Sequence, residues 1–252
     1  MRKHNHLKSY TLAGLAAAAS IIAVGWNGLI ADPNQSESQQ RPFTEDFMLE
    51  TCTFSDTGRN PFFSLVPDDQ LVLAGVEGKE ELEVVITVLS DTRDVTVPGL
   101  GTISTRVVEE RESVDGELAE ISRNFFAICE ETNSVFYFGE KVDIYEDGEI
   151  VSHDGAWEAG VDGALPGIVM PGTFLLGSRY FQEMAPDVAM DRGENAAMNL
   201  TVEVPAGTFE NSIMIFETST LGASDRSIKI YAPGIGLIVD DAVRLVEYDV
   251  AP

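Results

Sequence analysis

Apolar residues recur at every second position in one segment of this chain after another. Leu82, Val84, Ile86 and Val88 alternate with more polar side chains, a pattern typical of a β-strand with one buried face. Similar short segments follow at 102–110, 117–128, 135–138, 142–146, 149–152, 199–204, 212–217, 227–231, 237–239 and 243–248. No amphipathic pattern of helical period extends beyond two turns. The repetition predicts an all-β domain.

The turns between these segments indicate antiparallel pairing. Asp115-Gly116 and Asp147-Gly148 each join two alternating segments, and Asp-Gly suits the positive φ angles of a type I′ hairpin turn. Many short strands with tight turns are typical of an antiparallel meander, which closes into a barrel, a half-barrel or a sandwich. We expect a single β domain over 47–252, with alternating Ile, Val, Leu and Phe inside and the acidic residues mainly outside.

The N-terminus has the form of an export signal. Arg2, Lys3 and Lys8 precede a stretch without charged side chains, as in a secretory signal peptide. We expect a signal peptide over 1–25 and a flexible leader over 26–46, which predicts a secreted or periplasmic protein without stable membrane insertion after cleavage. An uncleaved membrane anchor is the alternative, because the uncharged stretch is long enough to cross a bilayer.

Charge and composition exclude several classes of protein. The chain has 16 Lys and Arg against 42 Asp and Glu, a net charge of −26, which argues against binding to nucleic acid or to an anionic membrane. Three His and two Cys are too few for zinc fingers or iron–sulfur clusters. In an exported protein, Cys52 and Cys129 are candidates for a disulfide, with a buried free thiol as the alternative.

A glycine-rich segment interrupts the series of strands. Six glycines lie between Gly155 and Gly177, together with Pro166 and Pro171. Proline and glycine disfavour both a regular helix and a central strand. Loops of this length inside a domain are usually lids or binding loops. We therefore expect a long loop, with the segment 153–191 lying over the mouth of the barrel.

Several motifs of the chain resemble an uncharacterised family of secreted bacterial proteins and lipoproteins. They are Asn60-Pro61-Phe62-Phe63, Phe136-Tyr137-Phe138-Gly139-Glu140, 155–164 (GAWEAGVDGA), Pro166-Gly167-Ile168-Val169-Met170-Pro171, Tyr180-Phe181-Gln182-Glu183, Pro205-Ala206-Gly207-Thr208-Phe209 and 231–238 (YAPGIGLI). The resemblance covers about Asn60 to Tyr248. Phe136 departs from the family pattern, in which Trp stands at that position. The resemblance implies export and a β fold, and it supplies no catalytic residue.

The same region provides a candidate binding site for a small or amphiphilic ligand. Ligand sites in barrel mouths combine an apolar wall with a few polar groups. The expected apolar wall consists of Trp157, Met170, Phe174, Tyr180 and Phe181, and the expected polar contacts are His153, Glu158 and Glu183. This interpretation favours a non-enzymatic binding protein that needs no cofactor.

Three alternatives remain open from the sequence. An extracytoplasmic hydrolase acting on carbohydrates or esters would use His153, the single histidine after residue 25, or one of the carboxyl pairs Glu158/Asp162, Glu183/Asp191 and Glu140/Asp143. Ser178 lacks the Gly-x-Ser-x-Gly pattern of a hydrolase nucleophile. A Ca²⁺ site would use Asp154, Glu158 and Asp162, since calcium prefers oxygen ligands. A structural or assembly module, with or without calcium, is the third class.

Overall fold

The computed structural model describes residues 42–222 and 226–251. The expected signal peptide and most of the expected leader lie outside these residues. One short 3-10 helix, η1, spans Leu49–Thr51. The strands are β1 (Phe54–Ser55), β2 (Arg59–Asn60), β3 (Phe63–Ser64), β4 (Gln70–Glu77), β5 (Glu80–Val97), β6 (Gly101–Val114), β7 (Glu117–Cys129), β8 (Ser134–Glu146), β9 (Glu149–Ser152), β10 (Trp157–Glu158), β11 (Leu165–Met170), β12 (Arg179–Phe181), β13 (Glu183–Met184), β14 (Asp191–Val204), β15 (Gly207–Ser219), β16 (Arg226–Ala232), β17 (Gly236–Asp240) and β18 (Val243–Asp249).

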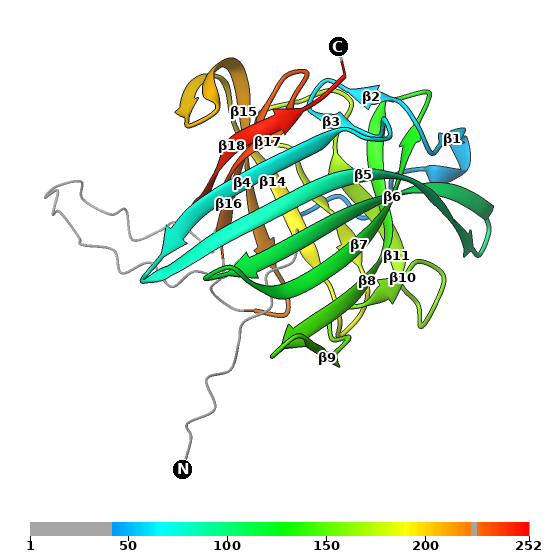
Figure 1. Ribbon diagram of the computed structural model, residues 1–252. Helices are drawn as coiled ribbons and strands as arrows, with labels where there is room; N and C mark the ends of the chain where they lie inside the picture. The colour runs from blue at the N-terminus through cyan, green and yellow to red at the C-terminus, as the bar shows by residue number, and fades with distance from the viewer. Residues whose placement is uncertain (1–41, 223–225, 252) are drawn as a thin grey trace, which may run out of the picture.

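The fold is all-β, as the alternating pattern predicts. One antiparallel sheet runs in the order β12-β14-β15-β16-β17-β18-β4-β5-β6-β7-β8-β11-β13 and curves into a barrel (Figure 1). Its two ends come together, because β12 and β13 are separated along the chain by Gln182 alone. The sheet is therefore nearly closed, which removes the exposed edges of an open sheet.

Local turn chemistry explains the long hairpins. Asp115 and Gly116 have φ angles of 52° and 79°, and Asp147 and Gly148 have the same pair of values. These positive angles give the turn the twist that matches two antiparallel strands. Both turns fall where the sequence predicts them, between β6 and β7 and between β8 and β9.

The glycine-rich segment forms loops over 159–164 and 171–178, as expected, but between them it also contributes a strand to the sheet. Its residues 165–170 form β11, which pairs with β8 on one side and with β13 on the other. Pro166 lacks an N–H, and it pairs only with Glu183 of β13. A Cβ on Gly167 would collide with the carbonyl oxygen of Phe181, so glycine permits this close approach. Residues 165–170 therefore belong to the barrel wall.

Residues 43 and 44, just before the expected domain, pack against its outer surface. Thr44, inside the expected leader, forms a parallel bridge with Tyr180. The guanidinium groups of Arg179 and Arg192 lie 4.0 and 4.5 Å from the ring centre of Phe43. Phe43 and Thr44, which fall inside the expected leader, therefore contact the domain.

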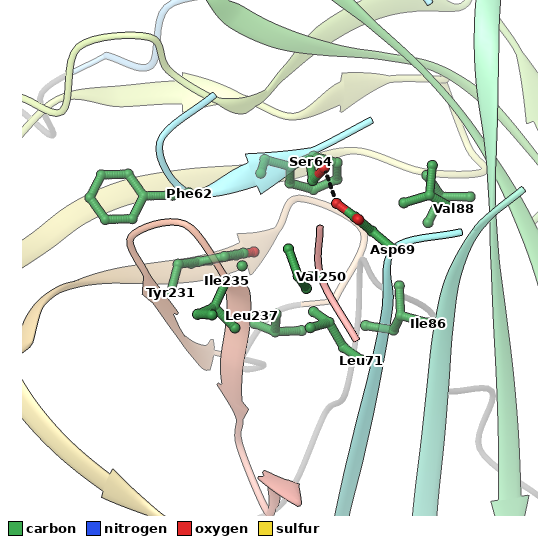
Figure 2. A pocket seen from close by; sticks show the side chains of 13 residues that line it. Phe62, Ser64, Asp69, Leu71, Ile86, Val88, Tyr231, Ile235, Leu237 and Val250 are labelled. Atoms are coloured by element: carbon green, nitrogen blue, oxygen red, sulfur yellow. Dashed lines mark hydrogen bonds between the residues drawn. The ribbon is translucent and has the colours of Figure 1, made fainter. Parts of the chain in front are cut away.

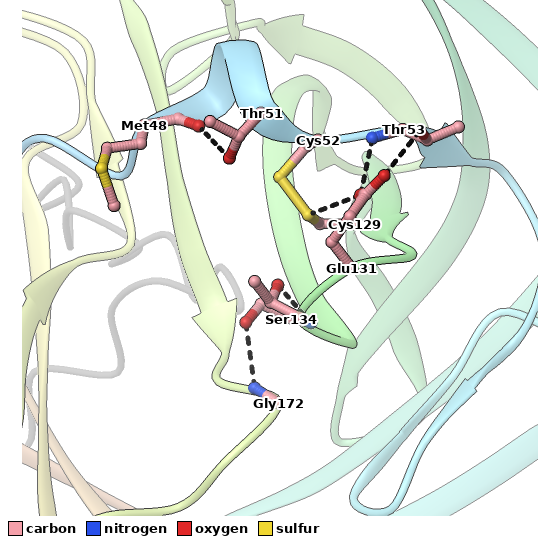
Figure 3. The surroundings of a disulfide bond; sticks show 9 residues. Met48, Thr51, Cys52, Thr53, Cys129, Glu131, Ser134 and Gly172 are labelled. Carbon is pink, nitrogen blue, oxygen red and sulfur yellow. Dashed lines mark hydrogen bonds between the residues drawn. A yellow bond between two sulfur atoms is a disulfide. The ribbon is translucent and has the colours of Figure 1, made fainter.

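A disulfide joins Cys52 to Cys129, at a sequence separation of 77 residues (Figure 3). The carboxylate of Glu131 lies beside it and accepts hydrogen bonds from the backbone N–H and the hydroxyl of Thr53, both at 2.7 Å. Phe54 then packs edge-on against Phe136 and Phe138. The bridge thus fastens the first residues of the domain to the end of β7. Among the described residues, no helix has the length and apolar character needed to cross a membrane.

Candidate functional site: an acidic cluster inside the barrel

The barrel interior contains a group of buried carboxyl side chains that we call the acidic cluster. Each of these eight residues is at most 6% exposed to solvent, and they come from seven different strands. They are Glu110, Glu112, Glu120, Glu140, Glu183, Asp191, Glu217 and Asp240. The expectation that acidic residues lie mainly outside is wrong for this group.

Strand register shows why these side chains point inward. Glu110 is paired with Ile86 of β5 and with Ser122 of β7, and paired residues of neighbouring strands project to the same face of a sheet. Ile86 belongs to the buried core. The same register aligns Glu112 with Glu120.

The cluster continues around the barrel and lies toward one end of it. Asn124 of β7 is paired with Glu140 of β8, and Lys229 of β16 is paired with Asp240 of β17. Glu112 and Glu120 lie close to the Asp115-Gly116 turn, and Asp240 is the last residue of β17, at the turn that leads to β18. These residues lie toward the end of the barrel where the β4–β5, β6–β7 and β8–β9 hairpins turn (Figure 1).

Lys229 is the buried cation of the cluster in the described part of the chain. Its Nζ lies 2.7 Å from Asp240 Oδ2 and 3.7 Å from Glu217 Oε2. Burial lowers the pKa of Lys229, but the attraction of these two carboxylates outweighs burial and raises that pKa well above its usual value. One ammonium group therefore stays charged among eight carboxyl groups.

Burial favours the protonated form of six carboxyl groups in the cluster, because it raises their pKa values. Burial raises the pKa of Glu110 to about 8, although Lys229 opposes the shift. It likewise raises the pKa of Glu217 to about 7 and that of Asp191 to about 6. Burial, reinforced by neighbouring carboxyl groups, holds the pKa values of Glu112, Glu140 and Glu183 well above the usual range.

Several acceptor atoms of the cluster have no hydrogen-bond partner within the described residues. They are Glu110 Oε2, Glu140 Oε1, Gln182 Oε1, Glu183 Oε2 and Asp240 Oδ1. The amide of Gln182 is directed into the cluster, because its Nε2 donates to Glu217 Oε1 at 2.6 Å. Buried polar groups in folded proteins are paired in the great majority of cases. Five unpaired oxygens in one region therefore point to a partner from outside the chain, which is ordered water or a ligand.

Aromatic side chains line the cluster on the β8 side. Trp157 is paired with Glu140 across β10 and β8, so both side chains project to the inner face. Its ring meets that of Tyr137 edge-on at 5.1 Å, and its Nε1 has no hydrogen-bond acceptor among the described residues. Tyr137 donates its hydroxyl hydrogen to Asn124 Oδ1.

The ligand-binding residues expected from the sequence are only partly brought together. Trp157, Tyr180 and Glu183 are buried in the interior, where the Tyr180 hydroxyl donates to Asn195 Oδ1 at 3.0 Å. Phe181 instead packs against Phe43. The remaining two members of the expected wall lie apart from these residues, since Met170 is paired with Val135 and Phe174 packs near Phe62.

Two of the three expected polar contacts, His153 and Glu158, lie outside the barrel. The His153 side chain is 67% exposed, and its Nδ1 lies 3.0 Å from Asp143 and 2.8 Å from the Val142 carbonyl oxygen. Glu158 pairs with Arg93 at 2.8 Å. The carboxyl pair Glu140/Asp143 is split between the two faces of β8, since an odd spacing places the side chains on opposite faces.

The calcium ligand set Asp154, Glu158 and Asp162 is not assembled. In the described part of the chain, Cys52, Cys129 and Glu131 are the single group of three such residues with ligand atoms within 4.8 Å of one another, and its two cysteines are joined in the disulfide. Asp154 and Asp162 are exposed. Of the carboxyl pairs, Glu183 and Asp191 do meet, because Glu183 Oε1 accepts the Asp191 N–H at 2.8 Å.

An apolar cavity lies in the interior next to the acidic cluster, since Ile86, which lines it, is paired with Glu110. It is lined by Phe62, Leu71, Ile86, Tyr231, Leu237 and Val250, among others (Figure 2). Its volume is about 50 Å³, roughly a third of the ~150 Å³ that accommodates benzene in a protein core. This cavity is too small to hold an alkyl chain.

The polar atoms at the edge of this cavity are already satisfied. Asp69 accepts hydrogen bonds from Ser64 Oγ and, at 2.9 Å, from the Ala251 N–H. It also pairs with Arg59 at 3.1 Å. Asp69 therefore anchors the C-terminal end of the chain to the barrel.

The acidic cluster could have been found in part from the sequence. Glu110 and Glu112 share the parity of Val108, and Glu140 shares that of Val142. The signal is ambiguous in 109–113 (EERES), where residues of both parities are polar. The comparison of the chain with protein families, with curated proteins and with solved structures finds no match.

Proposed function

We propose that this protein is an exported, non-enzymatic binding protein that holds a small organic ligand at the acidic cluster inside its barrel. The observation that carries the proposal is the set of unpaired, buried acceptor atoms on Glu110, Glu140, Gln182, Glu183 and Asp240. An unpaired buried acceptor costs about 1–3 kcal/mol. A ligand that donates hydrogen bonds to these atoms would remove that cost.

The size of the ligand follows from the packing. The apolar part of the interior is filled by large side chains such as Phe126, Leu73 and Ile215, and its cavity has a volume of only about 50 Å³. The arrangement supports a small ligand with several polar groups rather than a long-chain amphiphile.

Export is supported by two independent features. The first is the basic and then apolar N-terminal sequence, and the second is the Cys52–Cys129 disulfide. Disulfides persist in oxidising compartments such as the periplasm and the extracellular space.

A thermal-melting screen tests the proposal. The mature chain is melted in the presence of small amines, diols, sugars and carboxylic acids, because a ligand that binds only the native state raises the melting temperature. We expect at least one class to raise it for the wild type, and to do so much less for Gln182→Leu. A lack of any shift across all classes would reject the proposed binding function.

A further inference from the structure

The charges of the acidic cluster are strongly unbalanced. The cluster has eight buried carboxyl groups and one buried ammonium group, that of Lys229. This ammonium group is already paired with Asp240 and Glu217. Glu110, Glu140 and Glu183 each keep an oxygen without a partner in the described part of the chain. The chemistry that complements such oxygens is a positively charged hydrogen-bond donor.

Gln182 gives an observation that does not depend on the acidic residues. Its side chain is 4% exposed, and its amide nitrogen points to Glu217 while its amide oxygen has no donor among the described residues. A neutral acceptor is left unpaired beside the carboxyl groups. The missing partner is therefore a donor of hydrogen bonds.

A bare metal ion fits this arrangement poorly. Ca²⁺ takes six to eight oxygen ligands at about 2.3–2.6 Å, which requires several carboxyl groups to converge. No three carboxyl groups of the cluster have oxygens within 4.8 Å of one another in the described residues. The unpaired oxygens are instead spread over separate walls, on β6, β8, β13 and β17. Groups that are spread in this way suit an extended ligand with more than one positive charge.

The aromatic wall suits the remainder of such a ligand. Trp157 and Tyr137 lie in contact with each other, and Trp157 is the strand partner of Glu140. Aromatic faces accept both methylene groups and ammonium groups at close range. The carboxyl oxygens and the aromatic surface thus lie side by side.

On the premise of the proposed function, we infer that the ligand is a small diamine or oligoamine. Its ammonium groups pair with Glu140, Glu183 and the acceptors near them, and its methylene spacer lies along Trp157 and Tyr137. Binding is non-covalent. Each carboxyl group that is protonated in the free protein gives up its proton when it pairs with an ammonium group.

Calorimetric titration of the mature chain with a matched set of probes tests this inference. The probes are spermidine, 1,4-diaminobutane, butylamine, 1,4-butanediol and succinate. We expect spermidine and 1,4-diaminobutane to bind, butylamine to bind at least tenfold more weakly, and the diol and the diacid not to bind. Glu140→Gln and Glu183→Gln should each weaken diamine binding at least tenfold. The controls Glu146→Gln and Glu149→Gln alter exposed carboxylates of the same region and should change the Kd less than twofold.

A second measurement on the wild type avoids any dependence on the folding of the variants. Diamine binding at pH 7 in weak buffer should release protons, because burial keeps the carboxyl groups of Glu140 and Glu183 protonated. Adsorption to ionised surface carboxylates would release none, and this result would overturn the inference.

The remaining outcomes separate the inference from the proposed function. If the diol or the diacid binds and the diamines do not, the inference is wrong and the proposed function stands. Equal affinities for butylamine and 1,4-diaminobutane would also contradict the inference. If no probe of any class binds, both fail.

Discussion

Lys229 shows how the acidic cluster is held at the scale of single residues. Its ammonium group lies 2.7 Å from Asp240 Oδ2, and both side chains are buried. Removing one partner of a buried ion pair leaves an uncompensated charge, which typically costs about 3–5 kcal/mol. The lysine is therefore important for stability whatever the cluster binds.

We predict that Lys229→Met lowers the free energy of unfolding by about 3–5 kcal/mol at pH 7, measured by urea denaturation. The loss should shrink as the pH falls through about 7, where Glu217 takes up a proton. Lys141→Met is the matched control, because Lys141 is exposed on β8, and it should change stability by less than about 0.5 kcal/mol. Equal stabilities for Lys229→Met and Lys141→Met would show that the Lys229 site is not desolvated.

At the scale of the elements, the disulfide holds the first residues of the domain to the sheet, because β1 is too short to do so by strand pairing alone. β1 contributes two residues to the sheet, at Phe54 and Ser55. The adjacent bridge fixes this short strand to β7. A cross-link between residues far apart in the sequence stabilises the folded state by restricting the unfolded chain.

The double variant Cys52→Ala/Cys129→Ala should lose about 2–5 kcal/mol of unfolding free energy. The loop closed by the bridge is long, at a separation of 77 residues, which favours the upper part of that range. Urea denaturation of the variant against the oxidised wild type measures the loss. If the free energy of unfolding changes by less than about 0.5 kcal/mol, the disulfide does not stabilise the position of β1.

Elements set by local chemistry could be predicted from the sequence, whereas those set by distant pairing could not. Asp115-Gly116 determines its own hairpin, because the two residues accept positive φ. β11 contains Pro166 and Gly167, which argue locally against a strand. Its pairing with β8 and β13 is decided by residues far along the chain. The burial of Glu110 and Glu112 could not be predicted either. In 109–113 the odd and the even positions are both polar, so the alternation does not show which side chains face the interior.

At the scale of the whole molecule, the acidic cluster couples the stability of the barrel to pH. Burial raises the pKa values of Glu110, Glu217 and Asp191 to about 8, 7 and 6, whereas Glu and Asp in an unfolded chain titrate near ~4. The folded state therefore binds more protons than the unfolded state between these values. A group with a raised folded-state pKa stabilises most at low pH, and this stabilisation is lost as pH rises through the folded pKa.

We predict that the free energy of unfolding falls on the order of 2 kcal/mol or more between pH 5.5 and 8.5, measured by urea denaturation in 0.5 M NaCl. High salt screens the repulsion between surface charges, while buried groups are screened much less. Glu110→Gln should reduce the slope and Glu146→Gln should leave it unchanged. A free energy of unfolding that rises with pH over this range would contradict the assignment.

The most direct test of the binding site is a crystal structure of the mature chain grown with 1,4-diaminobutane at pH 8 and detailed enough to show ordered water. We expect an organic molecule inside the barrel, with nitrogen atoms at hydrogen-bond distance from Gln182 Oε1, Glu140 and Glu183. If these acceptors are instead bonded to groups of the protein itself, or hold only water, the cluster is a structural feature and the account of ligand binding is wrong.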